Sequence, residues 1–285
     1  MHLQMFRVKV YPVEGPRRTT QIQFDQFHPS AVLRARIEET PAPRVYYGAQ
    51  WHIGNLTTVG KDGMYFVVGR LTREERPKYQ ESAHRFVIEP APVAPFTHVL
   101  LDVSSGVCGI VPNRNVGDTP YDVAKQLQRI LDKGEPPTEP RVAFEVGPVS
   151  DPNEFLDYLL GAFKVNTITL KLSRPNPLDA EDLFHKPFTR LIEAAHADRG
   201  TATLSGSELD VDYVEDIVRS VSGTADDAVA TVRMQKDAPR ETKHLRDNPA
   251  GLEIPDISDP ENRRAALELL RTEYQKIRTR DRDAS

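Results

Sequence analysis

Cysteine is nearly absent from this chain of 285 residues, in which Cys108 is the only one. A lone cysteine excludes a disulfide within the chain and any metal site made of several cysteines. Long apolar runs are missing as well, because no stretch approaches the roughly 20 residues that span a bilayer. The first residues also lack the apolar segment of a secretory signal. We therefore expect a cytoplasmic protein without membrane insertion.

The motifs of several common enzyme classes are missing too. The sequence has no GxxxxGK(S/T) or GxGxxG loop for nucleotides, and no GxSxG turn of the usual hydrolases. Its eight histidines form no HxH or HxxxH pair that would place two imidazoles on one face. Cys108 has no histidine near it in the sequence, which favours a buried residue over a nucleophile. We expect no metal and no cofactor.

Positive charge is not in excess. The chain has 37 Lys and Arg against 42 Asp and Glu, a net charge of −5, which excludes a globally basic nucleic-acid protein. Hydrophobic residues make up 39%, enough for a folded core. Three prolines lie between Gly134 and Pro140, where they favour an extended connection. We place a boundary there, between a strand-rich domain (1–136) and a mixed α/β domain with a C-terminal helix (137–285).

The first half is dominated by strand patterns. Residues 45–56 and 64–71 are rich in aromatic and β-branched side chains and flank a glycine-containing turn at 60–63, which predicts a β-hairpin. The other elements expected here are strands at 3–10, 84–89, 98–103 and 107–111, and helices at 30–39 and 119–133. A curved antiparallel sheet with one or two helices fits this half.

The second half alternates between strand and helix patterns. Strands are expected at 142–146, 165–172, 201–205 and 228–234, and helices from Asp151, from Pro187, over 211–221 and from Asp259 to about Thr279. In the strand at 165–172 one face is expected to carry Val165, Thr167, Thr169 and Lys171. The whole chain is therefore predicted to belong to the α+β class.

Basic residues cluster after the last of these strands. The group consists of Arg233, Lys236, Arg240, Lys243 and Arg246. Only Asp237 and Glu241 oppose it, so the segment carries a local charge of +3 on an acidic protein. Such a segment favours binding to a nucleic-acid backbone, because each phosphate that a lysine or arginine neutralises releases counterions.

The C-terminal helix carries two stripes. Leu267, Leu270, Tyr274 and Ile277 form an apolar stripe, and Arg264, Arg271 and Arg278 fall close together around the helix axis. The arginine line fits phosphate contacts, but a solvated helix edge or the flank of a dimer helix pair explains it equally simply. The apolar stripe is a candidate dimer seam.

Three further residues are candidates for contacts or chemistry. Arg174 lies in the proline-rich loop 173–177, which is either a rigid crossover or a phosphate contact. Arg190 and His196 have a spacing found in some metal-independent ribonucleases, where the pair acts on the 2′-hydroxyl and the phosphate. On a helix, however, these two residues do not share a face, which favours a structural histidine.

A family resemblance adds to these observations. The order of elements and the segments at 146–156, 170–177 and 274–277 look like an uncharacterised bacterial family carried on mobile elements and linked to phage defence. Length and layout are also similar to the RexA-type phage-exclusion proteins. The resemblance spans nearly the whole chain, implies a DNA-binding dimer and carries over no catalytic residue.

Three functions follow as hypotheses. The first is a nucleic-acid-binding component of an anti-phage or mobile-element system, for DNA rather than RNA, acting as a sensor or assembly protein without catalysis. The second is a nuclease toxin of the same context that uses either Arg190 and His196 or a dispersed set of carboxylates. The third is a homo-oligomeric interaction protein that dimerises through the C-terminal helix and binds a partner protein.

Overall fold

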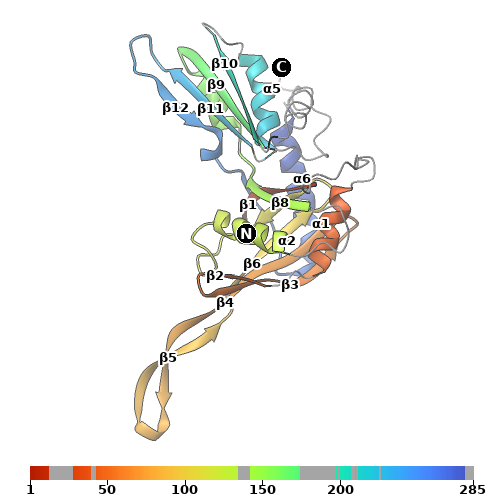
Figure 1. The fold of residues 1–285 in the computed structure, drawn as a ribbon, viewed down its shortest axis with the longest axis vertical. Coiled ribbons are helices and arrows are strands. Elements are labelled where there is room, and N and C mark those ends of the chain that lie inside the picture. Colours follow the sequence, from red (N-terminus) through yellow and green to blue (C-terminus); the bar gives the residue numbers. More distant parts are fainter. Residues whose placement is uncertain are drawn as a thin grey trace.

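A computed structural model describes residues 1–12, 28–39, 43–133, 142–173, 197, 199–206, 209, 211–224 and 226–279. These residues form five α-helices and thirteen strands in two antiparallel sheets. The first half is rich in strands and the chain has a C-terminal helix, which confirms the predicted α+β class. Figure 1 shows the larger sheet in the middle of the molecule and the smaller sheet above it.

The larger sheet has nine strands within the described residues. They are β1 (His2–Pro12), β2 (Arg44–Tyr46), β3 (Ala49–Val59), β4 (Gly63–Gln80), β5 (Arg85–Val93), β6 (Phe96–Asp102), β7 (Val107–Ile110), β8 (Val142–Pro148) and β13 (Gly251–Glu253). Their order is β13-β1-β7-β6-β4-β3-β2, with β8 also paired to β1 and β5 to β4. The predicted hairpin is confirmed as β3 and β4, joined where Gly60 adopts a φ of 63° that glycine tolerates readily.

Helices cover both faces of the larger sheet. Side chains alternate along β4, so that Met64 and Phe66 join the core beneath α1 (Pro29–Glu38) and α2 (Pro120–Lys133), whereas Tyr65 and Val67 join the core beneath α6 (Arg263–Arg278). Local caps set the helix starts: Thr119 and Asp122 exchange hydrogen bonds at the first turn of α2. None of the helices described is long and apolar enough to cross a membrane.

The smaller sheet is covered by helices on one face. Its strands β9 (Lys164–Ser173), β10 (Arg199–Ser205), β11 (Asp227–Arg233) and β12 (Glu241–His244) are ordered β10-β9-β11-β12. The apolar side chains of α3 (Asn153–Leu160) and α5 (Val211–Ser222) pack with Ile168, Leu170 and Ala230 of this sheet into a third core.

Elements from both sides of the expected boundary share one sheet. The prolines of that boundary lie in residues 134–141, outside the described residues. Beyond them, β8 pairs with seven successive residues of β1, and β13 pairs with its first residues. Helix α6 completes the core on the face that carries Leu3 and Met5. The larger sheet is thus built from residues on both sides of position 137.

One hairpin extends far beyond the body of the molecule. Among the described strands, residues 72–80 of β4 pair only with residues 85–93 of β5, and most of their side chains are exposed. Figure 1 shows this two-stranded ribbon projecting from the bottom of the molecule. We call residues 72–93 the arm. The expected strand at 84–89 is thus one side of a ribbon that no helix covers among the described residues.

Candidate nucleic-acid interface

The smaller sheet has one face that the described helices leave open. Along β10, residues 199, 201, 203 and 205 are exposed, while Ala202 and Leu204 turn toward the helices. Along β11, Ala228, Ala230 and Val232 are buried in the core and the residues between them face the other way. The register of the four strands therefore defines what we call the open face. Its residues are Lys164, Thr167, Thr169, Lys171, Arg199, Thr201, Thr203, Ser205, Asp227, Val229, Thr231, Arg233, Thr242 and His244.

Hydroxyl groups line the open face in rows. Ser205, Thr167 and Thr231 lie side by side on three neighbouring strands, and Thr203 lies beside Thr169 in the next row. The hydroxyl oxygens of Thr169 and Thr203 are 3.2 Å apart, within hydrogen-bond distance. Hydroxyls can donate to phosphate oxygens, and a flat row of them presents donors at regular spacing. Such a surface suits contacts to a repeating backbone.

The charge of the open face is positive. It carries Lys164, Lys171, Arg199 and Arg233 against Asp227 as its only acidic member. Asp227 is already paired, because its Oδ2 lies 3.5 Å from Nε of Arg246 and 3.4 Å from Nδ1 of His244. The Nε atom of Arg233 is buried and makes no hydrogen bond in the part of the chain that the structure describes. The face thus has donors in excess over acceptors.

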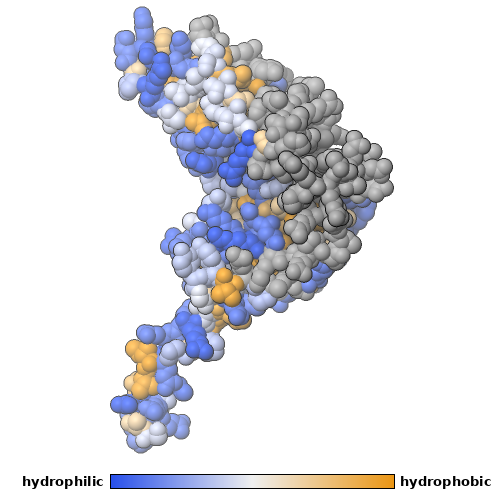
Figure 2. Space-filling view, viewed as in Figure 1, coloured by the Kyte–Doolittle hydropathy of each residue, from blue (hydrophilic) through white to orange (hydrophobic). Residues whose placement is uncertain are grey.

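Two predicted residues extend this positive surface. Lys236 and Arg240 lie in the connection between β11 and β12, where both side chains are exposed. Figure 2 shows hydrophilic atoms over the tip of this hairpin, at the upper end of the molecule. The hairpin is at the opposite end from the arm. Three residues of the predicted cluster, namely Arg233, Lys236 and Arg240, therefore lie on or next to the open face.

Two other members of the cluster are placed differently. Lys243 lies opposite Ala230, on the side of the sheet that faces α3, and its Nζ is 5.9 Å from the centre of the Tyr158 ring. Arg246 remains largely exposed but forms the ion pair with Asp227. Alternation along β12 is the reason, since adjacent residues of a strand point to opposite faces. The five basic residues therefore do not form one surface.

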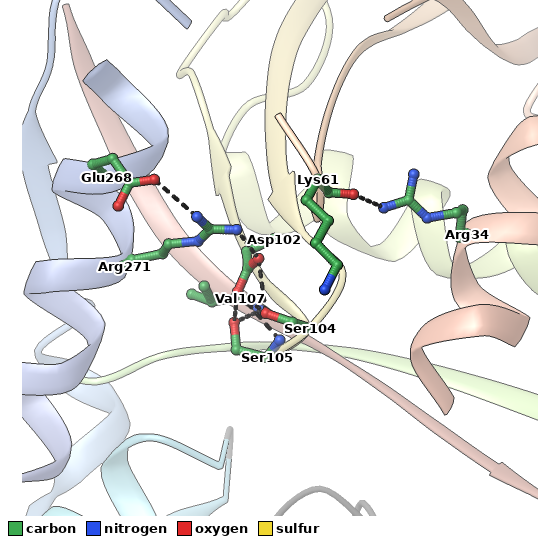
Figure 3. A network of polar contacts seen from close by, with 8 residues as sticks. All are labelled: Arg34, Lys61, Asp102, Ser104, Ser105, Val107, Glu268 and Arg271. Carbon is green, nitrogen blue, oxygen red and sulfur yellow. Dashed lines mark hydrogen bonds and ion pairs between the residues drawn. The ribbon is translucent and has the colours of Figure 1, made fainter. Parts of the chain in front are cut away.

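The arginine line of α6 lies apart from the open face. Arg264 is exposed. The Arg271 guanidinium donates to Asp102 at 2.7 Å and to Glu268 at 2.8 Å, as Figure 3 shows. Arg278 stacks over the ring of Tyr274, 5.7 Å from its centre. Two of the three arginines thus serve contacts within the chain.

The Asp102 carboxylate accepts hydrogen bonds from several donors near one turn. Ser104, Ser105 and Arg271 all donate to its carboxylate, and the serines lie in the connection between β6 and β7. Burial would raise the pKa of this carboxyl, but the hydrogen bonds from Arg271 and the two serines hold it below its usual range. In Figure 3 the Lys61 backbone, held by Arg34 at 2.6 Å, lies next to this turn. The network joins α6 and α1 to neighbouring turns of the sheet.

The apolar stripe of α6 is used inside the chain. Its four members, Leu267, Leu270, Tyr274 and Ile277, are at most 6% exposed and pack with residues of the larger sheet. Contact with Leu3, Met5 and Val107 removes their apolar surface from water, as the helix periodicity predicts. The stripe predicted as a dimer seam therefore faces the protein's own core and leaves little surface for a partner helix.

The structure does not test three of the predicted site residues. The catalytic candidates Arg190 and His196 and the phosphate-contact candidate Arg174 lie outside the described residues. Cys108 is fully buried in β7, and burial raises the pKa of its thiol to about 12, so it is protonated at neutral pH. Among the described residues no three histidine, cysteine or acidic side chains gather as metal ligands.

A separate cavity lies on the α6 side of the larger sheet. It has a volume of about 440 Å³ and is lined by Asn55, Leu56, Thr57, Tyr65, Phe96, His98, Ser258 and Arg263. The Tyr65 hydroxyl is 2.7 Å from Nδ1 of His98, and the Arg263 guanidinium stacks over the Tyr65 ring at 3.6 Å. Burial lowers the pKa of His98. The charge of Asp256 raises this pKa, and the charge of Arg263 lowers it further. The cavity is thus aromatic, with a neutral imidazole at neutral pH.

Sequence reasoning missed three basic residues of the open face. Lys164, Lys171 and Arg199 are isolated charges in the sequence, and only strand pairing brings them together with Arg233. The alternation in β9 was the available signal, but a bulge opposite Thr231 and Val232 shifts the register. As a result Val165 is buried in the core, whereas the strict alternation placed it with Thr167.

Comparisons with known proteins do not assign a family. No known family model matches the chain, and no curated protein matches it.

Proposed function

We propose that this chain binds duplex DNA through the open face and the adjoining β11–β12 connection. The observation that carries the proposal is the grouping of Lys164, Lys171, Arg199 and Arg233 among rows of threonine and serine hydroxyls. Cations neutralise phosphates and hydroxyls donate to their oxygens, so the surface matches a sugar–phosphate backbone. The protein would act as a sensor or assembly component rather than as an enzyme.

The composition of the face favours a duplex over a single strand. Proteins that hold single strands stack the bases on aromatic side chains. The described residues of the open face include no Phe, Tyr or Trp. Contacts restricted to phosphates imply binding with little base specificity and a strong dependence on salt. The setting in an anti-phage or mobile-element system rests on the family resemblance alone.

Charge reversal on the open face tests this function. We expect Lys171→Glu combined with Arg199→Glu to weaken binding of a labelled duplex at least tenfold at moderate salt. A tenfold loss is about 1.4 kcal/mol, which two lost phosphate contacts and two added repulsions supply. The control is Lys125→Glu, which changes an exposed lysine on α2. Equal affinities of the double variant, the control and the wild type would refute the assignment.

A denaturing gel of the same mixtures, with and without Mg²⁺, tests the alternative. Intact nucleic acid after incubation is expected for a binding protein. Cleavage that disappears in His196→Ala would instead support the nuclease hypothesis.

A further inference from the structure

The arm has one apolar face and one polar face. Cross-strand neighbours in an antiparallel pair share a face, and successive pairs alternate. Tyr79 pairs with Phe86, and Pro77 pairs with Ile88, on one face of the ribbon. The same alternation adds Pro90 and Pro92 to this face and places Lys78, Val87 and Glu89 on the other. Lys78 donates to Glu89 at 3.1 Å across the polar face.

The apolar face is exposed to an unusual degree. Phe86 is 77% exposed, Ile88 69% and Tyr79 47%, although they form one contiguous cluster in which the Tyr79 and Phe86 rings are 5.1 Å apart. An isolated two-stranded ribbon gains little from its own packing, so large apolar groups on it favour a covered state. Clusters of this kind on a protein surface mark interaction sites.

The charges of the arm favour a protein partner over a nucleic acid. Residues 72–93 contain four basic residues (Arg73, Arg76, Lys78 and Arg85) and four acidic residues (Glu74, Glu75, Glu81 and Glu89). The arm is therefore neutral and has no excess of cations for phosphates. At the base of the apolar face Arg73 and Glu75 are of opposite sign, so a reversed copy of this face meets complementary charges.

The candidate binding site for the tip of the arm lies at the base of the arm. Phe96 and His98 pair with Gly69 and Val67, so they stand on the side of the larger sheet that packs against α6. This is the side of the odd-numbered residues of β4, and the apolar face of the arm carries the odd-numbered residues further along the same strand. The aromatic cavity is lined by these two side chains and by Tyr65. Leu71, at 46% exposed, lies between the cavity and the arm.

We propose that two copies of this chain form a two-fold dimer in which each arm seats its tip, with Tyr79, Phe86 and Ile88, in the cavity of the other copy. The tip of the arm and the cavity lie on the same side of β4, so two copies can make an isologous contact. A two-fold axis that crosses the two arms places each tip on the cavity of the other copy. The stretch from Gly69 to Gln80 is roughly 35 Å long at about 3.3 Å per residue, enough to reach across the axis. Aromatic side chains bury about 150–250 Å² each, and such anchors dominate interface energetics.

Light scattering and sedimentation over a concentration series test the dimer. The wild type is expected to change from monomer to dimer with concentration. Phe86→Ser is expected to raise the dimer dissociation constant at least tenfold, as the loss of a central aromatic anchor does. Val87→Ser, on the opposite face of the ribbon next to Phe86, is the matched control and should leave the constant unchanged. A wild type that stays monomeric, or a dimer indifferent to Phe86→Ser, would overturn the proposal.

Crosslinking tests where the tip docks. The only native cysteine, Cys108, is fully buried, so single introduced cysteines react alone. A mixture of Ser82→Cys, in the turn at the tip of the arm, with Thr57→Cys is expected to form a crosslinked heterodimer with a short bis-maleimide, because Thr57 lines the cavity and all three anchors remain in place. Lys125→Cys, on α2, in place of Ser82→Cys should crosslink far less. Equal crosslinking of both, or none with Ser82→Cys, would exclude the cavity as the receptor.

The same variants separate this dimer from DNA binding. If Phe86→Ser lowered the affinity for a DNA duplex while the wild type remained monomeric, nucleic acid rather than a second copy would cover the arm. That result would overturn the dimer and leave the open-face assignment standing, because charge reversal of Lys171 and Arg199 is measured independently.

Discussion

Lys9 of β1 and Asp226, just ahead of β11, form an ion pair between the two sheets, with 3.0 Å between Nζ and Oδ1. Their side chains are only 1% and 5% exposed, and Thr224 donates a further hydrogen bond to Asp226 at 2.8 Å. Nearby, Arg7 of the same strand donates to the Gly223 carbonyl at 3.0 Å. The junction of the larger and smaller sheets is therefore polar and buried, which makes it sensitive to the loss of a single partner.

Lys9→Met is expected to lower the free energy of unfolding by about 3–5 kcal/mol, because it removes the cation that lies 3.0 Å from the buried Asp226 carboxylate. Chemical denaturation measures the change. The double variant Lys9→Met/Asp226→Leu should recover part of the loss, since apolar side chains then replace both members of the buried pair. Additive losses in the double variant would show that the two residues are not coupled.

Asp102→Asn is expected to destabilise the protein by about 1–3 kcal/mol at neutral pH, because it removes charged hydrogen bonds from Arg271 and two serines. The folded-state pKa of Asp102 is lowered, so its contribution is complete above the unfolded value near 4 and is lost as pH falls through the folded value. Unfolding curves of wild type and variant between pH 7 and pH 3 should therefore converge in acid. A constant difference over that range would contradict the assignment.

His98 should make stability depend on pH near neutrality. Its folded-state pKa is lowered by burial, so below about 6.5 the unfolded chain binds a proton that the folded chain does not. The free energy of unfolding is expected to fall as pH drops from about 6.5, by at most about 1.4 kcal/mol per pH unit for one proton, and to level off once folded His98 is protonated. His98→Gln should flatten this part of the profile. His84→Gln, which removes an exposed imidazole in the turn of the arm, is the control.

Arg240→Ala and Lys243→Ala should differ in their effect on DNA binding. Arg240 is exposed beside the open face, so its loss is expected to reduce the slope of log affinity against log salt by about one. Lys243 points toward α3 and Tyr158, so its loss should leave the slope unchanged. Titrations of a fluorescent duplex at four or more salt concentrations measure both slopes. A larger effect from Lys243→Ala would place the interface on the helical side.

Most helices and strands were predictable because the features that form them act between residues close in the sequence. Glycines in the turn before Met64 and the Thr119 cap of α2 act within a few residues, so the hairpin and the helix were recognisable. The short strands β12 and β13 were missed, because Glu241–His244 is polar and Gly251–Glu253 has only three residues. What stabilises them is pairing with distant strands, which leaves no local pattern.

The candidate site was only partly predictable for the same reason. Arg233, Lys236 and Arg240 stood out because they are neighbours in the sequence, whereas Lys171 and Arg199 join them only through the pairing of β9 with β10 and β11. The apolar stripe of α6 was correctly predicted. Periodicity indicates that Leu270 is covered, but it does not indicate whether the protein's own core or a partner chain covers it. In the arm, Phe86 and Ile88 have the pattern of a core strand and are exposed.

Strand β1 has consequences for how the chain is made. It is synthesised before its partner strands, and one of its edges is completed by β8 and β13, of which Glu253 follows His2 by 251 residues. At about 5–20 residues per second, a ribosome needs roughly 10–50 s to deliver that last partner. During this time β1 presents unpaired backbone groups to any other nascent chain. Full-length yield should therefore depend on translation speed and on chaperones that shield this edge, whereas fragments that end before residue 251 should accumulate as aggregates.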